Sequence, residues 1–233
     1  NTRNAIPRSA EAIVVVDERF HDDFLREVAL FRKLFKHEYN LIENNIALTC
    51  EEVKMPKGIL PVDFQKKFIN VIEATPDGVE RMIPGIEDTV ETSSNLAIVC
   101  CNDGLVTIQI LVRSTMASRK YNYISKLWSL YSLVDAEIEL FGDYPSWTPN
   151  LDSPILNVAK DFYKECFGEE LKTKVMHAGL ECGVISSLYP KMDMISIGPN
   201  MLHPHSPDER VEIVSVEKFW NFLLGILKNS PFK

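Results

Sequence analysis

A histidine between two prolines is the residue in this sequence that points most directly to chemistry. His205 lies in residues 204–209, which read Pro-His-Ser-Pro-Asp-Glu and follow a turn signal, Gly-Pro-Asn, at 198–200. The prolines stiffen the loop because each fixes its own φ and restrains the residue before it. Asp208 and Glu209 are close enough to orient the imidazole, as carboxylates do for metal-binding histidines. His205 is therefore a candidate metal ligand; His203 competes with it, and a solvated loop histidine is the alternative.

Two further blocks precede this loop at short distances. Residues 177–183 read His-Ala-Gly-Leu-Glu-Cys-Gly, and residues 192–199 read Met-Asp-Met-Ile-Ser-Ile-Gly-Pro. Together with residues 204–209 they resemble the C-terminal catalytic segment of aminoacyl-histidine dipeptidases (Xaa-His dipeptidases), a branch of the di-zinc aminopeptidase and carboxypeptidase family. The resemblance extends to Asn-Ala-Ile-Pro-Arg at 4–8, Leu-Val-Arg-Ser at 111–114 and Gly-Asp-Tyr-Pro-Ser-Trp-Thr-Pro-Asn at 142–150. It thus covers nearly the whole chain, although residues 15–92 match only in their pattern of elements.

The resemblance implies both a fold and a function. It implies an α/β protein with an α/β-sandwich lid domain, which serves dimerisation, and the C-terminal part of a mixed-sheet zinc-peptidase catalytic domain. The implied boundary separates residues 1–142 from 143–233, where prolines and glycine punctuate residues 142–154. In the intact family, two zinc ions polarise the scissile carbonyl and activate a water, and the peptide bond ahead of a C-terminal histidine is cut. We therefore expect part of a cytosolic zinc dipeptidase acting on Xaa-His dipeptides.

The residues of this chain account for only part of such a site. By the resemblance, most metal ligands and the general base come from an N-terminal half with a His-x-Asp, a bridging Asp and a Glu-Glu pair. This sequence has no His-x-Asp, and its Glu-Glu pairs at 51–52 and 169–170 lie in polar, lysine-bearing contexts typical of solvated surface. We expect a fragment without catalytic residues that retains no zinc and hydrolyses no dipeptide, because a catalytic zinc needs about three protein ligands.

The resemblance assigns roles to four residues. His205 would be the last ligand of the di-zinc centre. Arg113 matches a position that contacts the substrate's C-terminal carboxylate or the oxyanion, and the planar guanidinium suits either task. Asn4 matches a lid asparagine that donates to the substrate, and Gly179 a glycine whose backbone faces the bound carboxylate. The alternatives are a surface arginine at a strand end, an Asx cap before Pro7 and a glycine in a tight turn.

The sequence departs from the family near its start. Many relatives carry a substrate-binding arginine about a dozen residues after the asparagine, where this chain has Asp17 and Glu18, which leaves Arg113 as the candidate. The lid histidine that such families extend toward the active site, often from a partner subunit, would lie upstream of this sequence. His21 and His37 fall on a predicted helix and are interpreted as solvated or capping residues.

Composition argues against several classes of partner. The 233 residues carry 25 Lys+Arg against 33 Asp+Glu, a net charge of −8, which disfavours nucleic acid and anionic membranes. The five cysteines are odd in number and form no Cys-x-x-Cys, which favours a reducing cytosol over a disulfide framework. No stretch approaches the roughly 18 apolar residues of a spanning helix. We expect a soluble cytoplasmic protein, and the resemblance implies that its partners are a dipeptide and a second copy of itself, bound through the lid.

The hydrophobic pattern predicts alternating strands and helices. Asp-Gly at 103–104, between apolar runs, predicts a β-hairpin, and the aromatic residues of 20–37 recur at helical spacing and should face a core. The adjacent Cys100 and Cys101 are interpreted as small hydrophobic residues of a strand. The predicted strands are 12–16, 46–53, 96–101, 105–112, 136–141, 172–176 and 192–197. The predicted helices are 20–37, 61–74, 156–167, 182–188, 215–227 and one around residues 124–131.

Two other functions remain open. The chain could belong to a related amidohydrolase or carboxypeptidase of the same family with a different specificity. It could instead be a non-catalytic module in which the sandwich dimerises or binds a small ligand. Residues 177–209 favour an enzyme, because a dimerisation module has no use for a histidine in a stiff Pro-His-Ser-Pro loop.

Overall fold

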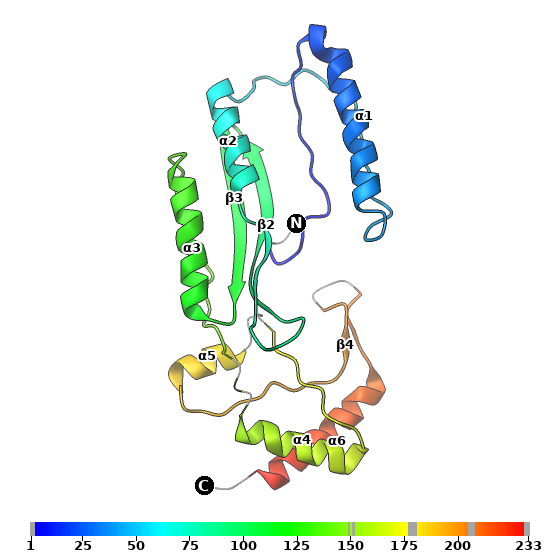
Figure 1. Cartoon of the computed structure of the whole chain (residues 1–233), viewed down its shortest axis with the longest axis vertical. Helices are drawn as coiled ribbons and strands as arrows, with labels where there is room; N and C mark the ends of the chain where they lie inside the picture. Colours follow the sequence, from blue (N-terminus) through cyan, green and yellow to red (C-terminus); the bar gives the residue numbers. More distant parts are fainter. Residues whose placement is uncertain (1–2, 149, 151, 177–180, 205–207, 231–233) are drawn as a thin grey trace.

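The structure is a computed structural model that describes residues 3–148, 150, 152–176, 181–204 and 208–230. The chain forms an elongated molecule with two groups of elements along its long axis (Figure 1). One group contains α1 to α3 and β1 to β3, and the other contains α4 to α6 and the β4–β5 pair. The expected α/β class is confirmed, since both groups combine helices with strands.

The first group is built around an antiparallel sheet with strand order β1-β2-β3. Its strands are β1 (Gly78–Met82), β2 (Val90–Asn102) and β3 (Leu105–Ser114). The predicted hairpin is confirmed: Asn102 pairs with Leu105, and the two residues between them have positive φ, 50° at Asp103 and 81° at Gly104. Positive φ at both central positions is the type I′ geometry that matches the strand twist, and asparagine, aspartate and glycine tolerate it best.

Two helices cover one face of this sheet. They are α2 (Val62–Ala74) and α3 (Ala117–Ser132), and both lie where the sequence pattern predicts them. Val71 of α2 and three α3 residues, Tyr123, Leu127 and Tyr131, form the core against alternate residues of β3, namely Ile108, Ile110 and Val112. The buried phenol oxygen of Tyr131 lies 2.9 Å from the Thr75 hydroxyl, so the polar end of the ring is satisfied.

The second group has its own small core. Its elements are α4 (Pro154–Phe167), α5 (Glu181–Leu188), α6 (Ile213–Asn229), β4 (Met201–Leu202) and β5 (Arg210–Val211). Ser153 caps α4 by accepting a hydrogen bond from the Leu156 amide at 3.1 Å, and Gly168 ends the helix with a φ of 70°. Ala159 of α4 packs against Phe222 and Ile226 of α6. The three predicted helices of this region are confirmed.

Several predicted strands are wrong as strands. Residues 12–16, 46–53, 136–141, 172–176 and 192–197 contain neither helix nor strand. Ile13, expected in a buried strand, is 58 % exposed. An apolar run becomes a strand only when a neighbouring strand accepts and donates its backbone hydrogen bonds, and the described residues provide no such neighbour for these runs. The expected mixed sheet of the second group is therefore limited to the β4–β5 pair.

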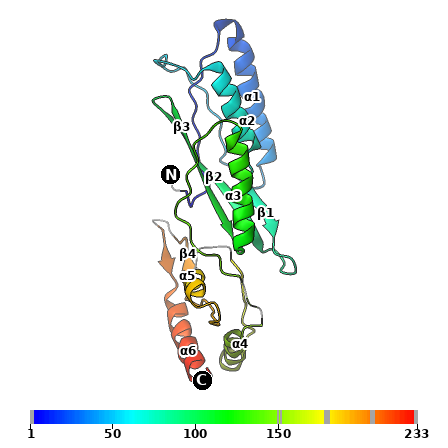
Figure 2. The ribbon, with the colours of Figure 1, turned by 90° about the vertical axis from the view of Figure 1, so that its left-hand side faces the viewer.

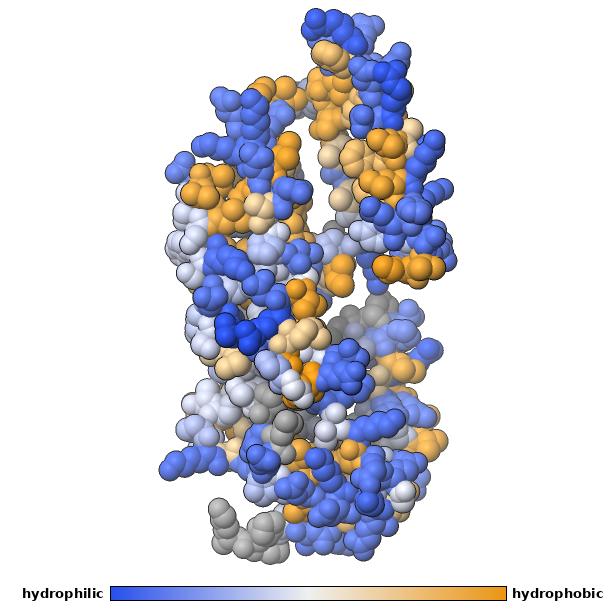
Figure 3. Space-filling view, viewed as in Figure 1, coloured by the Kyte–Doolittle hydropathy of each residue, from blue (hydrophilic) through white to orange (hydrophobic). Residues whose placement is uncertain are grey.

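The predicted core position of the first long helix is also wrong. Helix α1 (His21–Glu38) forms as expected, but none of its residues is buried, and Phe31 is 45 % exposed. Figure 3 shows apolar patches along this helix, which stands apart from the sheet in Figure 1. Cys100 and Cys101 lie in β2 as expected, yet both are exposed rather than packed. Among the described residues, no helix is both long and apolar enough to cross a membrane.

Candidate functional site

Arg113 is the predicted site residue whose surroundings are clearest. It lies near the end of β3, opposite Ser93 of β2 in the strand register, and is half-buried. Its neighbour Val112 packs toward the helices, so alternation along the strand directs Arg113 to the opposite face of the sheet. No described residue forms a hydrogen bond or ion pair with its guanidinium. Five N–H donors on a half-buried group are thus available for an anion, and their fork geometry suits a carboxylate.

Asn4 lies on the same face of the sheet. Asn95, two residues along β2 from Ser93, donates through Nδ2 to the carbonyl oxygens of Arg3 and Ala5, at 3.1 and 2.9 Å. Residues two apart in a strand share a face and are separated by about 7 Å. In both views of the ribbon, the N-terminal end lies on the side of β2 away from α3 (Figures 1 and 2). The structure therefore brings Asn4 and Arg113 to one face, and the amide of Asn4 makes no hydrogen bond within the described chain.

The segment that follows α3, residues 133–148, is called the outgoing segment here. It passes beside the N-terminal residues of the chain. The Arg3 guanidinium stands over the Phe141 ring, 4.6 Å from its centroid. Lys120 of α3, whose side chain is 9 % exposed, pairs with the Asp143 carboxylate and donates to the Tyr144 carbonyl oxygen at 2.8 Å. The N-terminal segment and the start of the segment after α3 thus lie together, and the latter is held on α3 by Lys120.

Helix α5 packs closely on this outgoing segment. Gly183 is buried against the Pro145 carbonyl, and a Cβ at this position would overlap the carbonyl oxygen. Glycine is therefore required for the approach of the helix to the backbone. Burial raises the pKa of the Cys182 thiol beside it, which favours the neutral thiol at physiological pH.

Two predicted site residues, His205 and Gly179, lie outside the described residues. The competing His203 directly follows β4 and has a φ of 51°. No group of three or more His, Cys, Asp or Glu side chains in the described part of the chain is placed to hold a metal ion. The glutamate pairs at 51–52 and 169–170 are exposed. The described residues alone therefore do not fit a zinc centre.

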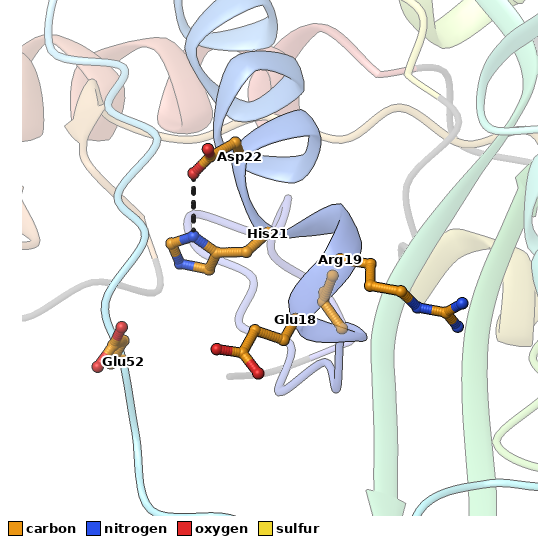
Figure 4. Close-up of a pocket in the computed structure, with 6 residues that line it drawn as sticks. Glu18, Arg19, His21, Asp22 and Glu52 are labelled. Atoms are coloured by element: carbon orange, nitrogen blue, oxygen red, sulfur yellow. Dashed lines mark hydrogen bonds and ion pairs between the residues drawn. The ribbon is translucent and has the colours of Figure 1, made fainter.

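A hollow beside the start of α1 gathers further titratable side chains without forming a metal site. Figure 4 shows His21 and Glu18 facing Glu52 of a separate segment, with the His21 Nδ1 atom 3.4 Å from an Asp22 carboxylate oxygen. The His21 side chain is half-exposed, in agreement with its interpretation as a solvated helix residue.

Two polar groups of this sheet were not predicted from the sequence. One is Asn95, and the other is Glu91, which is 3 % exposed and lies 3.2 Å from Arg81 and 4.0 Å from Arg119. A carboxylate at the start of an apolar strand was the available signal for Glu91, because such a group is buried only when it is paired. Asn95 gave a weaker signal, as an amide directly before the apolar run 96–101.

Comparisons with known proteins identify relatives of the whole chain. The sequence matches the model of peptidase family M20/M25/M40 over residues 32–229. It is 39 % identical over 231 residues to the cytosol non-specific dipeptidase of Escherichia coli (strain K12), covering 99 % of this chain and 48 % of that protein. Its structure is similar to the crystal structure of aminoacylhistidine dipeptidase from Vibrio alginolyticus, with a TM-score of 0.81 and 36 % identity over 92 % of this chain and 44 % of that one.

The chain therefore spans about half the length of the relatives that it matches. The matched family region covers most of the sequence and includes β3 with Arg113, the outgoing segment and helices α4 to α6. The two relatives are 39 % and 36 % identical to this chain, and the solved structure also shares its fold. This chain belongs to peptidase family M20/M25/M40.

Proposed function

We propose that this chain is the lid and C-terminal catalytic segment of a cytosolic zinc dipeptidase. In this proposal residues 1–142 form the lid and dimerisation domain, and residues 143–233 form the end of the catalytic domain. The observation that carries it is Arg113, a half-buried guanidinium with no partner among the described side chains, on the same sheet face as Asn4. The dipeptidase relatives support the same reaction class.

Arg113 binds the C-terminal carboxylate of the dipeptide, because a planar guanidinium pairs with a carboxylate through two parallel hydrogen bonds. Asn4 donates to the substrate from the adjacent segment, and the backbone at Gly179 faces the bound carboxylate. In the longer protein, His205 would be one ligand of zinc, which would polarise the scissile carbonyl. Arg113 and Asn4 bind and orient the dipeptide independently of the metal.

The substrate class follows from what Arg113 recognises. A free C-terminal carboxylate is common to all dipeptides, whereas a preference for C-terminal histidine needs contacts with the imidazole. One relative is named a non-specific dipeptidase and the other an aminoacylhistidine dipeptidase, so both breadths occur among similar proteins. We propose Xaa-His dipeptides as substrates; a related amidohydrolase or carboxypeptidase specificity is the second candidate.

The test uses the longer protein that contains this chain, supplied with zinc. Substrates are an Xaa-His dipeptide, the same dipeptide with a C-terminal amide, and an N-acyl amino acid. Charge-assisted hydrogen bonds contribute about 1.5–3 kcal/mol, so Arg113→Ala should lower kcat/KM for the free acid by roughly 10- to 150-fold. Arg113→Ala should change hydrolysis of the amide little, because the amide lacks the carboxylate. Equal losses on the free acid and on its amide would refute carboxylate binding by Arg113, and a preference of the unaltered protein for the N-acyl amino acid would favour the second candidate.

Two further measurements address the role of the chain itself. The 233-residue chain alone should hydrolyse no Xaa-His dipeptide with added zinc, and turnover at roughly 1 to 1,000 per second would contradict the fragment proposal. Light scattering should show a homodimer formed through the lid, and a monomer at tens of micromolar would contradict it. A longer protein that dimerises but cleaves no dipeptide would favour the non-catalytic module.

A further inference from the structure

We propose that Asn95 is a positioning residue, whose side-chain amide holds the backbone on both sides of Asn4 so that Asn4 can reach the substrate. The proposal rests on the proposed function, in which Asn4 contacts the dipeptide. Asn95 itself acts through Asn4 and touches no substrate.

The proposal is based on two hydrogen bonds of the Asn95 side chain. The Asn95 Nδ2 atom lies 3.1 Å from the Arg3 carbonyl oxygen and 2.9 Å from the Ala5 carbonyl oxygen. Both partners are acceptors, so the contacting atom of Asn95 must be the nitrogen, which carries two N–H donors in one plane. A hydroxyl has a single donor and could hold only one of the two carbonyls. The two contacts bracket Asn4: one holds the peptide group between Arg3 and Asn4, and the other holds the peptide group between Ala5 and Ile6.

Little else holds this segment on the sheet. Residues 3 and 4 form a turn, but residues 3–16 contain no helix or strand that would fix the segment on the sheet. The Arg3 guanidinium also stands over the Phe141 ring, which anchors the segment through a long side chain rather than through its backbone. The direction of the Asn4 side chain therefore depends on the Asn95 amide.

The strand register places Asn95 beside Arg113. Asn95 pairs with Leu111 and Ser93 pairs with Arg113, so the two pairs are successive on one face of the hairpin. The intervening Ser94 faces the other way, where its hydroxyl lies 2.5 Å from the buried Tyr123 phenol oxygen. Because Tyr123 also donates to the Pro76 carbonyl, this part of β2 is fixed from the helix side, and Asn95 projects from a rigid base.

The experiment is a double-mutant cycle in the longer, zinc-loaded protein, measured with an Xaa-His dipeptide. Asn95→Asp keeps the shape of the side chain but removes both donors and sets a carboxylate against two carbonyl oxygens. Misplacement of a substrate-binding group by about 1 Å costs up to roughly 100-fold, so we expect kcat/KM to fall by between about tenfold and 100-fold. In the Asn4→Ala background the same change should cost less than about twofold, because the group that Asn95 positions is already gone.

Asn102→Ala is the matched control, since this asparagine lies at the other end of the same strand and is exposed. It should leave kcat/KM unchanged. Asn95→Ala, which adds no charge, should reproduce the loss of Asn95→Asp. A purely structural role predicts instead the same loss in both backgrounds, and that result would overturn the proposal, as would full activity of both Asn95 variants.

Hydrogen exchange separates this inference from the proposed function. Asn95→Asp should speed amide exchange in residues 3–8, whereas Asn102→Ala should not. If the wild-type protein cleaves no dipeptide, the proposed function fails, while faster exchange would still support the grip on the backbone around Asn4. Unchanged exchange in residues 3–8 would overturn the inference even if the enzyme is active.

Discussion

Gly225 allows helices α4 and α6 to touch, and replacing it should separate them. Gly225 is buried in α6, and a Cβ added there would overlap the Phe162 ring of α4. The ring cannot easily turn aside, because it stacks on Phe222 with centroids 6.5 Å apart and an interplanar angle of 17°. Ala159 is fully buried in the same small core, against which the partly buried Phe162 packs.

The net effect of Gly225→Ala is the difference between two terms. Alanine stabilises a helix interior by about 0.5–1 kcal/mol relative to glycine. Forcing one extra carbon into a packed core costs about 1–3 kcal/mol. Because the overlap is with ring carbons that are held in place, the upper part of that range applies, and we expect a net loss of about 1–2 kcal/mol.

Hydrogen exchange measured on peptides of α4 and α6 is the assay, because it reports the local opening of this pair. A loss of 1–2 kcal/mol should speed exchange by a factor of about 5 to 30. Asn221→Ala is the control, since it changes an exposed position of the same helix and should be neutral or slightly stabilising. Adding Phe162→Leu to Gly225→Ala should recover part of the loss. Slower exchange in Gly225→Ala alone would mean that helix propensity prevails and the close helix contact is wrong.

Three other predictions concern the metal, the sheet core and the turn. In the longer protein, His205→Ala should remove one metal and nearly all activity without unfolding, whereas His203→Ala should have a much smaller effect. The measurements are the metal content and the dipeptidase rate of both variants. A larger loss at His203 would assign the metal ligand to that imidazole instead. Burial raises the pKa of the Tyr123 and Tyr131 phenols above the ordinary value of about 10. Their contribution to stability is thus complete below that pH and is lost as pH rises through the folded-state pKa, so urea unfolding should show a decline at alkaline pH that Tyr131→Phe reduces. Gly104→Ala should cost about 1–2 kcal/mol because its φ is 81° in open space, and Gly104→Asn should cost less; equal costs would contradict a backbone origin.

Local sequence signals predicted the elements whose ends are specified by their own residues. Asp103 and Gly104 encode the hairpin turn, and Ser153 and Gly168 lie at the two ends of α4, so each of these elements carries its own start or stop. The run 12–16 has an equally strong β pattern, but a strand also needs a partner, and none lies beside it in the described chain. The sequence pattern indicates that such a run is apolar and extended, but it does not indicate which other element pairs with it or packs against it.

The candidate site was predictable in its residue types and not in its contacts. Arg113 and Asn4 were identified from short motifs, while their shared face follows only from the register Ser93↔Arg113 and from the Asn95 bonds to Arg3 and Ala5. Asn4 and Asn95 are 91 positions apart, and no spacing rule connects residues at that distance. His205 stays a prediction, because it lies outside the described residues.

The contact between Arg3 and Phe141 means that about 140 residues begin and end at the same place. A stretch of chain whose two ends meet can be inserted into a host protein, or removed from it, without redirecting the host backbone. The whole helix-covered sheet therefore has the geometry of a cassette, exchangeable at a single junction while α4 to α6 keep their packing. Among proteins that share the second group of elements, we expect the largest differences in chain length to fall between the positions of Arg3 and Phe141.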